Sequence, residues 1–98
     1  MKISELKNGM SNVNLRAKVV DISDKREVMT KYGKRSVADA TIEDETGQIT
    51  LTLWGEQINE VSVGDTIEVK GAFVTEFREK LQVSVPRSGK IVKEVENL

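Results

Sequence analysis

The sequence predicts an all-β fold: a five-stranded Greek-key barrel with a short helix between the third and fourth strands and a short N-terminal helical turn. Three observations point to it. Valine and isoleucine, which favour strands, supply 13 and 7 of the 98 residues. Five segments alternate apolar and polar side chains, as strands with one buried face do. Five strands are too few for a β-sandwich, which normally needs about seven.

The helical turn and the first strand are expected near the start of the chain. Residues 4–6, followed by Asn8 and Gly9, fit one capped helical turn that ends at glycine. Residues 13–19 alternate apolar and polar side chains and predict the first strand. The loop that joins it to the second strand contains a turn at residues 31–34, in which Gly33 can adopt a positive φ.

The second and third strands are expected to form a hairpin. Residues 36–43 place alternate apolar side chains on one face, and the sequence Asp-Glu-Thr-Gly at 44–47 predicts the turn. Residues 49–54 show the clearest alternation in the chain. Because Ile49 and Leu53 face inward, this alternation directs Trp54 to the outside of the barrel.

The remaining elements complete the barrel. Residues 55–63 leave room for only a short helix, and the Val-Gly-Asp sequence at 63–65 predicts a turn into a fourth strand that begins at Thr66. Residues 80–85 predict the fifth strand, and residues 90–95 a last extended segment that closes the structure. This arrangement matches the oligonucleotide/oligosaccharide-binding (OB) fold, a small Greek-key barrel.

The composition argues against catalysis. The chain contains no Cys and no His, which removes thiol nucleophiles, imidazole bases and the usual zinc ligands. We therefore expect no cofactor, no bound metal, no small-molecule substrate and no enzymatic activity. The alternative is a nuclease that holds a metal ion with the carboxylates of Asp39, Glu43 and Asp44, although a turn explains Asp44 better.

Length and hydropathy predict one cytoplasmic domain, residues 1–98. A chain this short buries only about two-thirds of its unfolded surface, so a second core is not expected. The N-terminus lacks the apolar core of a signal peptide. The longest stretch without a charge, residues 46–55, is too short to cross a membrane.

Charge is unevenly distributed along the chain. The formal net charge is only −1, and residues 39–68 contain eight acidic residues and no Lys or Arg. In contrast, residues 25–35 contain five basic residues and one acid, and residues 76–93 contain five basic residues and two acids. If the fold brings the two basic segments together, one side of the protein is positive, as a nucleic-acid binder requires; the alternative is a mixed, solvated surface.

Four aromatic residues are the candidates for ligand contact. The outward Trp54 is suited to stack on a base, although it could instead pack against a loop or the terminal segment. Simple alternation turns Phe73 inward, whereas a β-bulge at Gly71 would turn it outward. Phe77 is expected at the tip of the hairpin between the fourth and fifth strands. Tyr32, in the first loop, could pack on the barrel rim or contact a nucleotide.

OB barrels bind oligomers across the second and third strands, between the first loop and the fourth-to-fifth-strand loop. Aromatic planes and cations along this groove are what sequence-tolerant binding of a single strand requires. The predicted stacking residues are Trp54, Phe73, Phe77 and Tyr32; the predicted phosphate contacts are Lys31, Lys34, Arg35, Arg78 and Lys80; the predicted groove-lining residues are Thr52, Gln82 and Ser84.

These residues also carry a family resemblance, which extends from about Ile3 to Val95. The sequences VNLRA at 13–17, TKYG at 30–33, EDETG at 43–47, LTLWG at 51–55 and VGD at 63–65 resemble archaeal single-stranded DNA-binding proteins and the OB domains of archaeal replication protein A.

The resemblance implies sequence-tolerant binding of single-stranded DNA in replication, recombination or repair. It also implies base stacking on Trp54, Phe73 and Phe77, and partner subunits of a replication protein A-like complex. RNA stays open as a ligand, because stacking does not distinguish the sugars. The alternative is an OB subunit whose exposed aromatic residues dock a partner protein and bind little nucleic acid.

Overall fold

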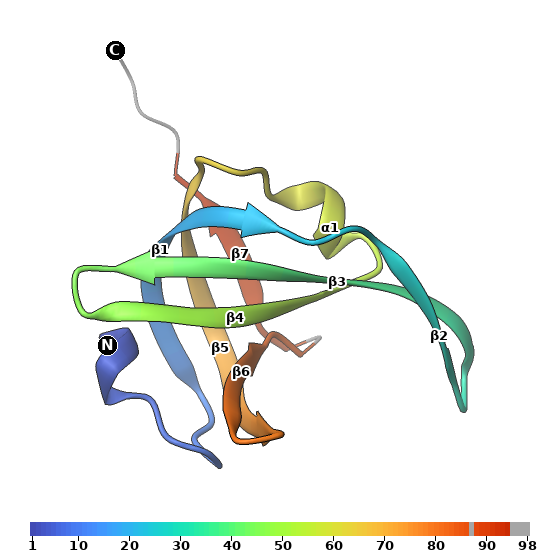
Figure 1. Ribbon diagram of the computed structural model, residues 1–98, viewed down its shortest axis with the longest axis horizontal. Helices are drawn as coiled ribbons and strands as arrows, with labels where there is room; N and C mark the ends of the chain where they lie inside the picture. The colour runs from blue at the N-terminus through green and yellow to red at the C-terminus, as the bar shows by residue number, and fades with distance from the viewer. Residues whose placement is uncertain (87, 95–98) are drawn as a thin grey trace.

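The protein is a barrel with two projecting hairpins, described here by a computed structural model that covers residues 1–86 and 88–94 (Figure 1). The elements in chain order are η1 (Ile3–Glu5), β1 (Val13–Ile22), β2 (Arg26–Thr30), β3 (Gly33–Asp44), β4 (Gly47–Trp54), α1 (Gln57–Glu60), β5 (Thr66–Phe77), β6 (Lys80–Ser84) and β7 (Lys90–Lys93).

Five of the strands form a closed ring. β1 pairs with β3, β3 with β4, β5 with β6 and β5 with β1, all antiparallel, while β4 and β6 pair in parallel. The predicted five-stranded barrel is therefore confirmed, with the predicted strands corresponding to β1, β3, β4, β5 and β6. The short helix between the third and fourth barrel strands and the N-terminal helical turn are present as α1 and η1.

The core lies inside this ring and follows the predicted alternation. In β4, Ile49, Leu51 and Leu53 are all buried and belong to the same apolar cluster. The inward side chains of the other strands join them, with Ile42 of β3 and Ile67 of β5 fully excluded from solvent. Burying these apolar side chains supplies the main driving force for closing the barrel.

The segment between the first two barrel strands differs from the prediction. It is not a simple loop: β2 pairs with the beginning of β3, and together they form a hairpin that projects from the barrel in Figure 1. Gly33, with φ of 108°, stands at its tip as expected. No residue of β2 is buried, and Met29 is 78% exposed. Without a buried face, β2 lacks the apolar alternation by which a strand is predicted.

The last extended segment also has a different place from the one predicted. Within residues 1–86 and 88–94, β7 pairs only with β5, and the ring is closed by the pairing of β1 with β5. β5 has 12 residues, so its first half contacts β1 and β7 while its second half contacts β6. The predicted end of this segment, Val95, lies outside the described residues.

A β-bulge in β5 decides where Phe73 points. Val13 pairs with Ala72 and Leu15 pairs with Val69, so β5 carries one extra residue there. Gly71 accommodates it with φ of 69°. The slip turns Ala72 into the core and leaves Phe73 36% exposed on the outer face. The outward orientation of Phe73 is therefore confirmed.

Candidate nucleic-acid interface

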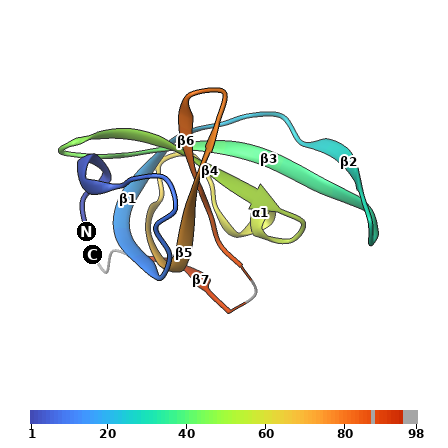
Figure 2. The same cartoon turned by 90° about the horizontal axis from the view of Figure 1, so that it is seen from below.

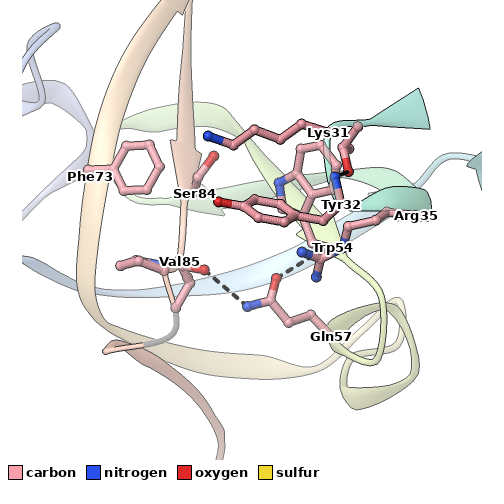
Figure 3. Close-up of a pocket in the computed structure, with 10 residues that line it drawn as sticks. Lys31, Tyr32, Arg35, Trp54, Gln57, Phe73, Ser84 and Val85 are labelled. Carbon is pink, nitrogen blue, oxygen red and sulfur yellow. Dashed lines mark hydrogen bonds between the residues drawn. The ribbon is translucent and has the colours of Figure 1, made fainter. Parts of the chain in front are cut away.

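A groove of about 500 Å³ crosses the outer face of the barrel between the β2–β3 hairpin and β5. Figure 3 shows Phe73 on one side of it and Tyr32, Trp54 and Arg35 on the other. The residues that line the groove are Thr30, Lys31, Tyr32, Arg35, Trp54, Gln57, Phe73, Ser84, Val85 and Pro86.

Trp54 is held at the end of β4 by a residue of α1. The side-chain amide of Gln57 accepts a hydrogen bond from the backbone N–H of Trp54 at 3.0 Å and donates one to the carbonyl of Val85 at 3.2 Å (Figure 3). Gln57 thereby connects the end of β4 to the residue that follows β6. Trp54 is half-buried, and its indole is the largest side chain among the residues that line the groove.

The tip of the β2–β3 hairpin presents Tyr32, which is 81% exposed. The hydroxyl of Thr30 donates to the carbonyl of Gly33 at 2.8 Å and accepts from the N–H of Tyr32 at 3.2 Å. These two hydrogen bonds organise the turn, so the phenol ring stands at the edge of the groove without support from the core.

Two cations accompany the aromatic side chains of the groove. The Lys31 Nζ lies 5.1 Å from the ring centre of Tyr32, and the Arg35 Cζ lies 6.0 Å from that of Trp54. Among the described residues, none that lines the groove is acidic. The groove therefore combines flat apolar surfaces with local positive charge, although the net charge of the whole chain is −1.

The strand register places Phe73 and the predicted groove-lining residues in adjacent positions. Phe73 pairs with Ser84, and Ser84 pairs with Thr52 across the parallel strands. Gln82 lies two pairs away from Ser84 on β6, between Thr50 of β4 and Thr75 of β5. Ser84 lines the groove, whereas Thr52 is only 7% exposed and lies beneath the surface.

Phe77, Arg78 and Lys80 lie on the β5–β6 hairpin, outside the lining of the groove. Phe77 is 58% exposed, and the Arg78 Cζ lies 5.2 Å from the centre of its ring. Phe77 and Lys80 are opposite partners in the strand pairing. This hairpin projects beyond the barrel wall in Figure 2.

Lys34 is also separate from the groove lining. Its Nζ lies 3.6 Å from a carboxylate oxygen of Glu27 on the opposite strand of the β2–β3 hairpin. Both side chains are more than half exposed, so this ion pair is weak and easily exchanged for another partner.

The carboxylates considered for a metal site have structural partners. Asp39 pairs with Arg26 at 3.2 Å, and Glu43 accepts a hydrogen bond from Gln48 at 3.3 Å. Asp44 accepts hydrogen bonds from the backbone N–H groups of Ile3 and Thr46. In the part of the chain that the structure describes, no group of three or more Asp, Glu, His or Cys side chains is arranged to hold a metal ion.

Asp44 has a perturbed acidity that reflects these contacts. Partial burial acts to raise the pKa of its carboxyl group, but hydrogen bonds from the Thr46 hydroxyl and from the backbone of Ile3, Thr46 and Gly47 outweigh it. The pKa of Asp44 is therefore below its ordinary value. This carboxylate ties η1 to the β3–β4 turn.

Sequence reasoning missed four residues of the groove: Thr30, Gln57, Val85 and Pro86. Thr30 could have been predicted as a groove residue, because it is β-branched and directly precedes the turn expected at residues 31–34. No local pattern identifies Gln57, because its role depends on Val85, a residue 28 positions away.

No helix within residues 1–86 and 88–94 is both long and apolar enough to cross a membrane.

The sequence was compared with protein-family models and with known proteins. Residues 6–93 match the family model described as single-stranded DNA binding protein Ssb-like, OB fold. The single-stranded DNA binding protein Ssb of Saccharolobus solfataricus is 32% identical over 96 residues, covering 98% of this chain and 65% of that protein. Replication factor A of Methanothermobacter thermautotrophicus is 28% identical over 96 residues, covering 94% of this chain and 12% of that protein.

A solved structure is similar over the whole chain. The second OB-fold domain of replication protein A from Methanococcus maripaludis has a TM-score of 0.80 and 34% identity, covering 100% of this chain and 97% of that one. The chain thus spans 65% and 12% of the lengths of the two relatives above, and nearly all of this domain. It belongs to the Ssb-like family of single-stranded DNA-binding proteins with an OB fold.

Proposed function

We propose that the chain holds single-stranded DNA by base stacking and phosphate contacts, with little preference for base sequence and without chemistry on the strand. The observation that carries the proposal is the groove in which Tyr32, Trp54 and Phe73 lie together with Lys31 and Arg35. Each base stacked on an aromatic side chain contributes roughly 1–3 kcal/mol and any base can stack, which accounts for tolerance of sequence.

The proposed roles follow the side-chain chemistry. Bases stack on Trp54, Phe73, Tyr32 and, beyond the groove, Phe77. Phosphates are contacted by Lys31, Lys34, Arg35, Arg78 and Lys80. Ser84 lines the groove, and the predicted groove-lining residues Gln82 and Thr52 lie near it on β6 and β4, outside the lining. The ion pair of Lys34 with Glu27 is exposed, so a phosphate can replace the carboxylate at little cost.

The test is a titration with oligo-dT at two salt concentrations. The fluorescence of Trp54, the single tryptophan, should be quenched, and Trp54→Ala should weaken binding of a labelled oligonucleotide by about 1–3 kcal/mol. Val63→Ala is the matched control, because Val63 is 60% exposed and does not line the groove. With about three phosphates neutralised, log K should fall with log salt at a slope near −2. The proposal is refuted if a long oligo-dT at low salt causes no change.

Oligo-rU in the same titration tests RNA, because contacts to the 2′-hydroxyl decide between the two sugars. For the whole protein, we propose a role in replication, recombination or repair. It would act in the cytoplasm, together with partner subunits of a replication protein A-like complex. Isolation of a partner that covers Trp54, together with no binding of either nucleic acid, would instead support the protein-docking alternative.

A further inference from the structure

A second groove of about 610 Å³ lies on the other side of the β5–β6 hairpin. In Figures 1 and 2 this hairpin stands between the β2–β3 hairpin and the N-terminal η1 beside the β3–β4 turn. We refer to this hollow as the N-terminal groove. Its lining includes the apolar side chains of Ile3, Leu6 and Leu81, and the polar side chains of Gln48, Thr50 and Lys80.

The N-terminal groove exists because β4 and β6 are paired over a short distance only. Their register includes Thr50 to Thr52 on β4 and Gln82 to Ser84 on β6. β4 extends beyond this region to Gly47, so the two strands are unpaired there. η1 covers the far side, held by the hydrogen bond from the Ile3 N–H to Asp44 at 2.8 Å. The N-terminal groove is therefore formed by β4, β6 and η1.

The two grooves share the same two strands. Trp54 and Ser84 line the first groove, and Thr50 and Lys80 line the second, in each case four residues back along the same strand. Four residues of a strand span about 13 Å. Lys80 is the pairing partner of Phe77, so the exposed ring of Phe77 stands beside the N-terminal groove and outside the lining of the first one.

We propose that the N-terminal groove receives a further nucleotide of the bound strand, beyond the one that stacks on Phe77. This inference rests on the proposed function and extends it by one binding subsite. The apolar floor accepts the face of a base or its sugar, the Thr50 hydroxyl and the Gln48 amide reach polar edges, and Lys80 holds the connecting phosphate. A strand that stacks on Trp54, Phe73 and Phe77 is led along β6 to this position.

Charge marks the N-terminal groove as the end of the binding site. The carboxylate of Glu43 is bonded to Gln48 at 3.3 Å, and Glu45, at the β3–β4 turn, is paired with Lys2 at 3.4 Å. Glu45 is offset by Lys2, whereas Glu43 is bonded to a residue of the groove lining, and we expect its carboxylate to repel a phosphate that follows the one held by Lys80. Affinity should therefore rise with oligonucleotide length until this groove is filled, and change little afterwards.

The experiment compares oligo-dT of increasing length on the full chain and on two variants. Ser4→Glu introduces a negative charge at the exposed rim of the N-terminal groove, and Thr50→Val removes a hydroxyl with little change of shape. Ser62→Glu is the matched control for net charge, because Ser62 is exposed in the turn before β5 and lines neither groove.

We expect Ser4→Glu to weaken binding of long oligo-dT about tenfold and Thr50→Val about threefold, and both to leave binding of the shortest bound oligomer within about twofold of the unchanged chain. Methyl resonances of Ile3 and Leu81 should shift with the long oligomer and not with the short one. Equal losses for Ser4→Glu and Ser62→Glu at every length, or methyl groups that do not respond to the long oligomer, would overturn the subsite while leaving the proposed function intact. If no oligomer binds the unchanged chain, both proposals fail.

Discussion

The side-chain oxygen of Gln57 lies 3.0 Å from the backbone nitrogen of Trp54, and through its amide nitrogen Gln57 also reaches the carbonyl of Val85 at 3.2 Å. One side chain of α1 thus sets the distance between the ends of β4 and β6. Since Trp54 and Ser84 stand at these ends, Gln57 is a positioning residue for the groove.

Replacing Gln57 by Ala should therefore affect both stability and binding. The loss of two hydrogen bonds should lower the free energy of unfolding by about 1–3 kcal/mol. Affinity for oligo-dT should fall as well, because Trp54 is no longer fixed. Chemical denaturation and a titration with a labelled oligonucleotide measure the two effects. Asn59→Ala, an exposed change in the same helix, is the control and should alter neither. If the Gln57→Ala variant is fully folded under the assay conditions and its affinity is unchanged, Gln57 contributes to stability alone.

Arg35 lines the groove, and its loss should change the salt dependence of binding. Arg35→Gln should reduce the slope of log K against log salt by about 0.7, the value for one phosphate contact on a single strand. Arg16→Gln removes the same charge from β1, where Arg16 pairs with Glu94 at 2.7 Å. This control should leave the slope unchanged. Equal slopes for the two variants would mean that only net charge acts on the strand.

Gly89 lies where the chain crosses over β5, and it has no room for a side chain. A Cβ atom at this position would be 2.5 Å from the carbonyl oxygen of Lys70 and 3.0 Å from that of Gly71. Gly89→Ala should therefore force the crossing apart and destabilise the protein by about 1–3 kcal/mol, measured by thermal or urea denaturation. Ser88→Ala, at the exposed neighbouring position, should have little effect. A Gly89→Ala variant as stable as the original chain would contradict the close approach.

Asp44 predicts a dependence of stability on pH. Its pKa in the folded protein lies below the ordinary value, so it binds a proton more readily in the unfolded chain. Its stabilising effect is therefore complete above the unfolded pKa of about 4 and is lost as the pH falls through the folded pKa. Asp44→Asn should cost about 1–2 kcal/mol at pH 7 and progressively less below pH 4. Urea denaturation of both chains at neutral and acidic pH tests this. A difference that does not change with pH would contradict the assignment.

Much of the barrel could be predicted because its strands have one buried and one exposed face. Ile49, Leu51 and Leu53 define such a face, and Trp54 follows from it. A bulge at Gly71 could be considered because glycine can adopt positive φ, while simple alternation pointed Phe73 inward, and the family resemblance favoured the outward orientation. Burial confirms the inward face of the strand, and the strand register confirms the bulge.

Other features depend on contacts that no local pattern records. β2 has no buried face, so its residues show no apolar alternation. The closing partner of the ring was misassigned because the pairing of β1 with β5 joins residues that are far apart in the sequence, such as Val13 and Ala72. Phe77 lies outside the first groove because the β5–β6 hairpin projects from the barrel. This projection depends on the register of the whole sheet.

The β2–β3 hairpin has a consequence for how such proteins can diversify. Its outer strand, β2, has no buried residue, and in the described part of the chain this strand pairs only with β3. Changes of length or sequence at its tip therefore leave the folding of the barrel largely unaffected, while they alter the edge of the groove that carries Tyr32 and Lys31. Natural variation in ligand preference should accumulate in this arm, and the barrel that bears it should change more slowly.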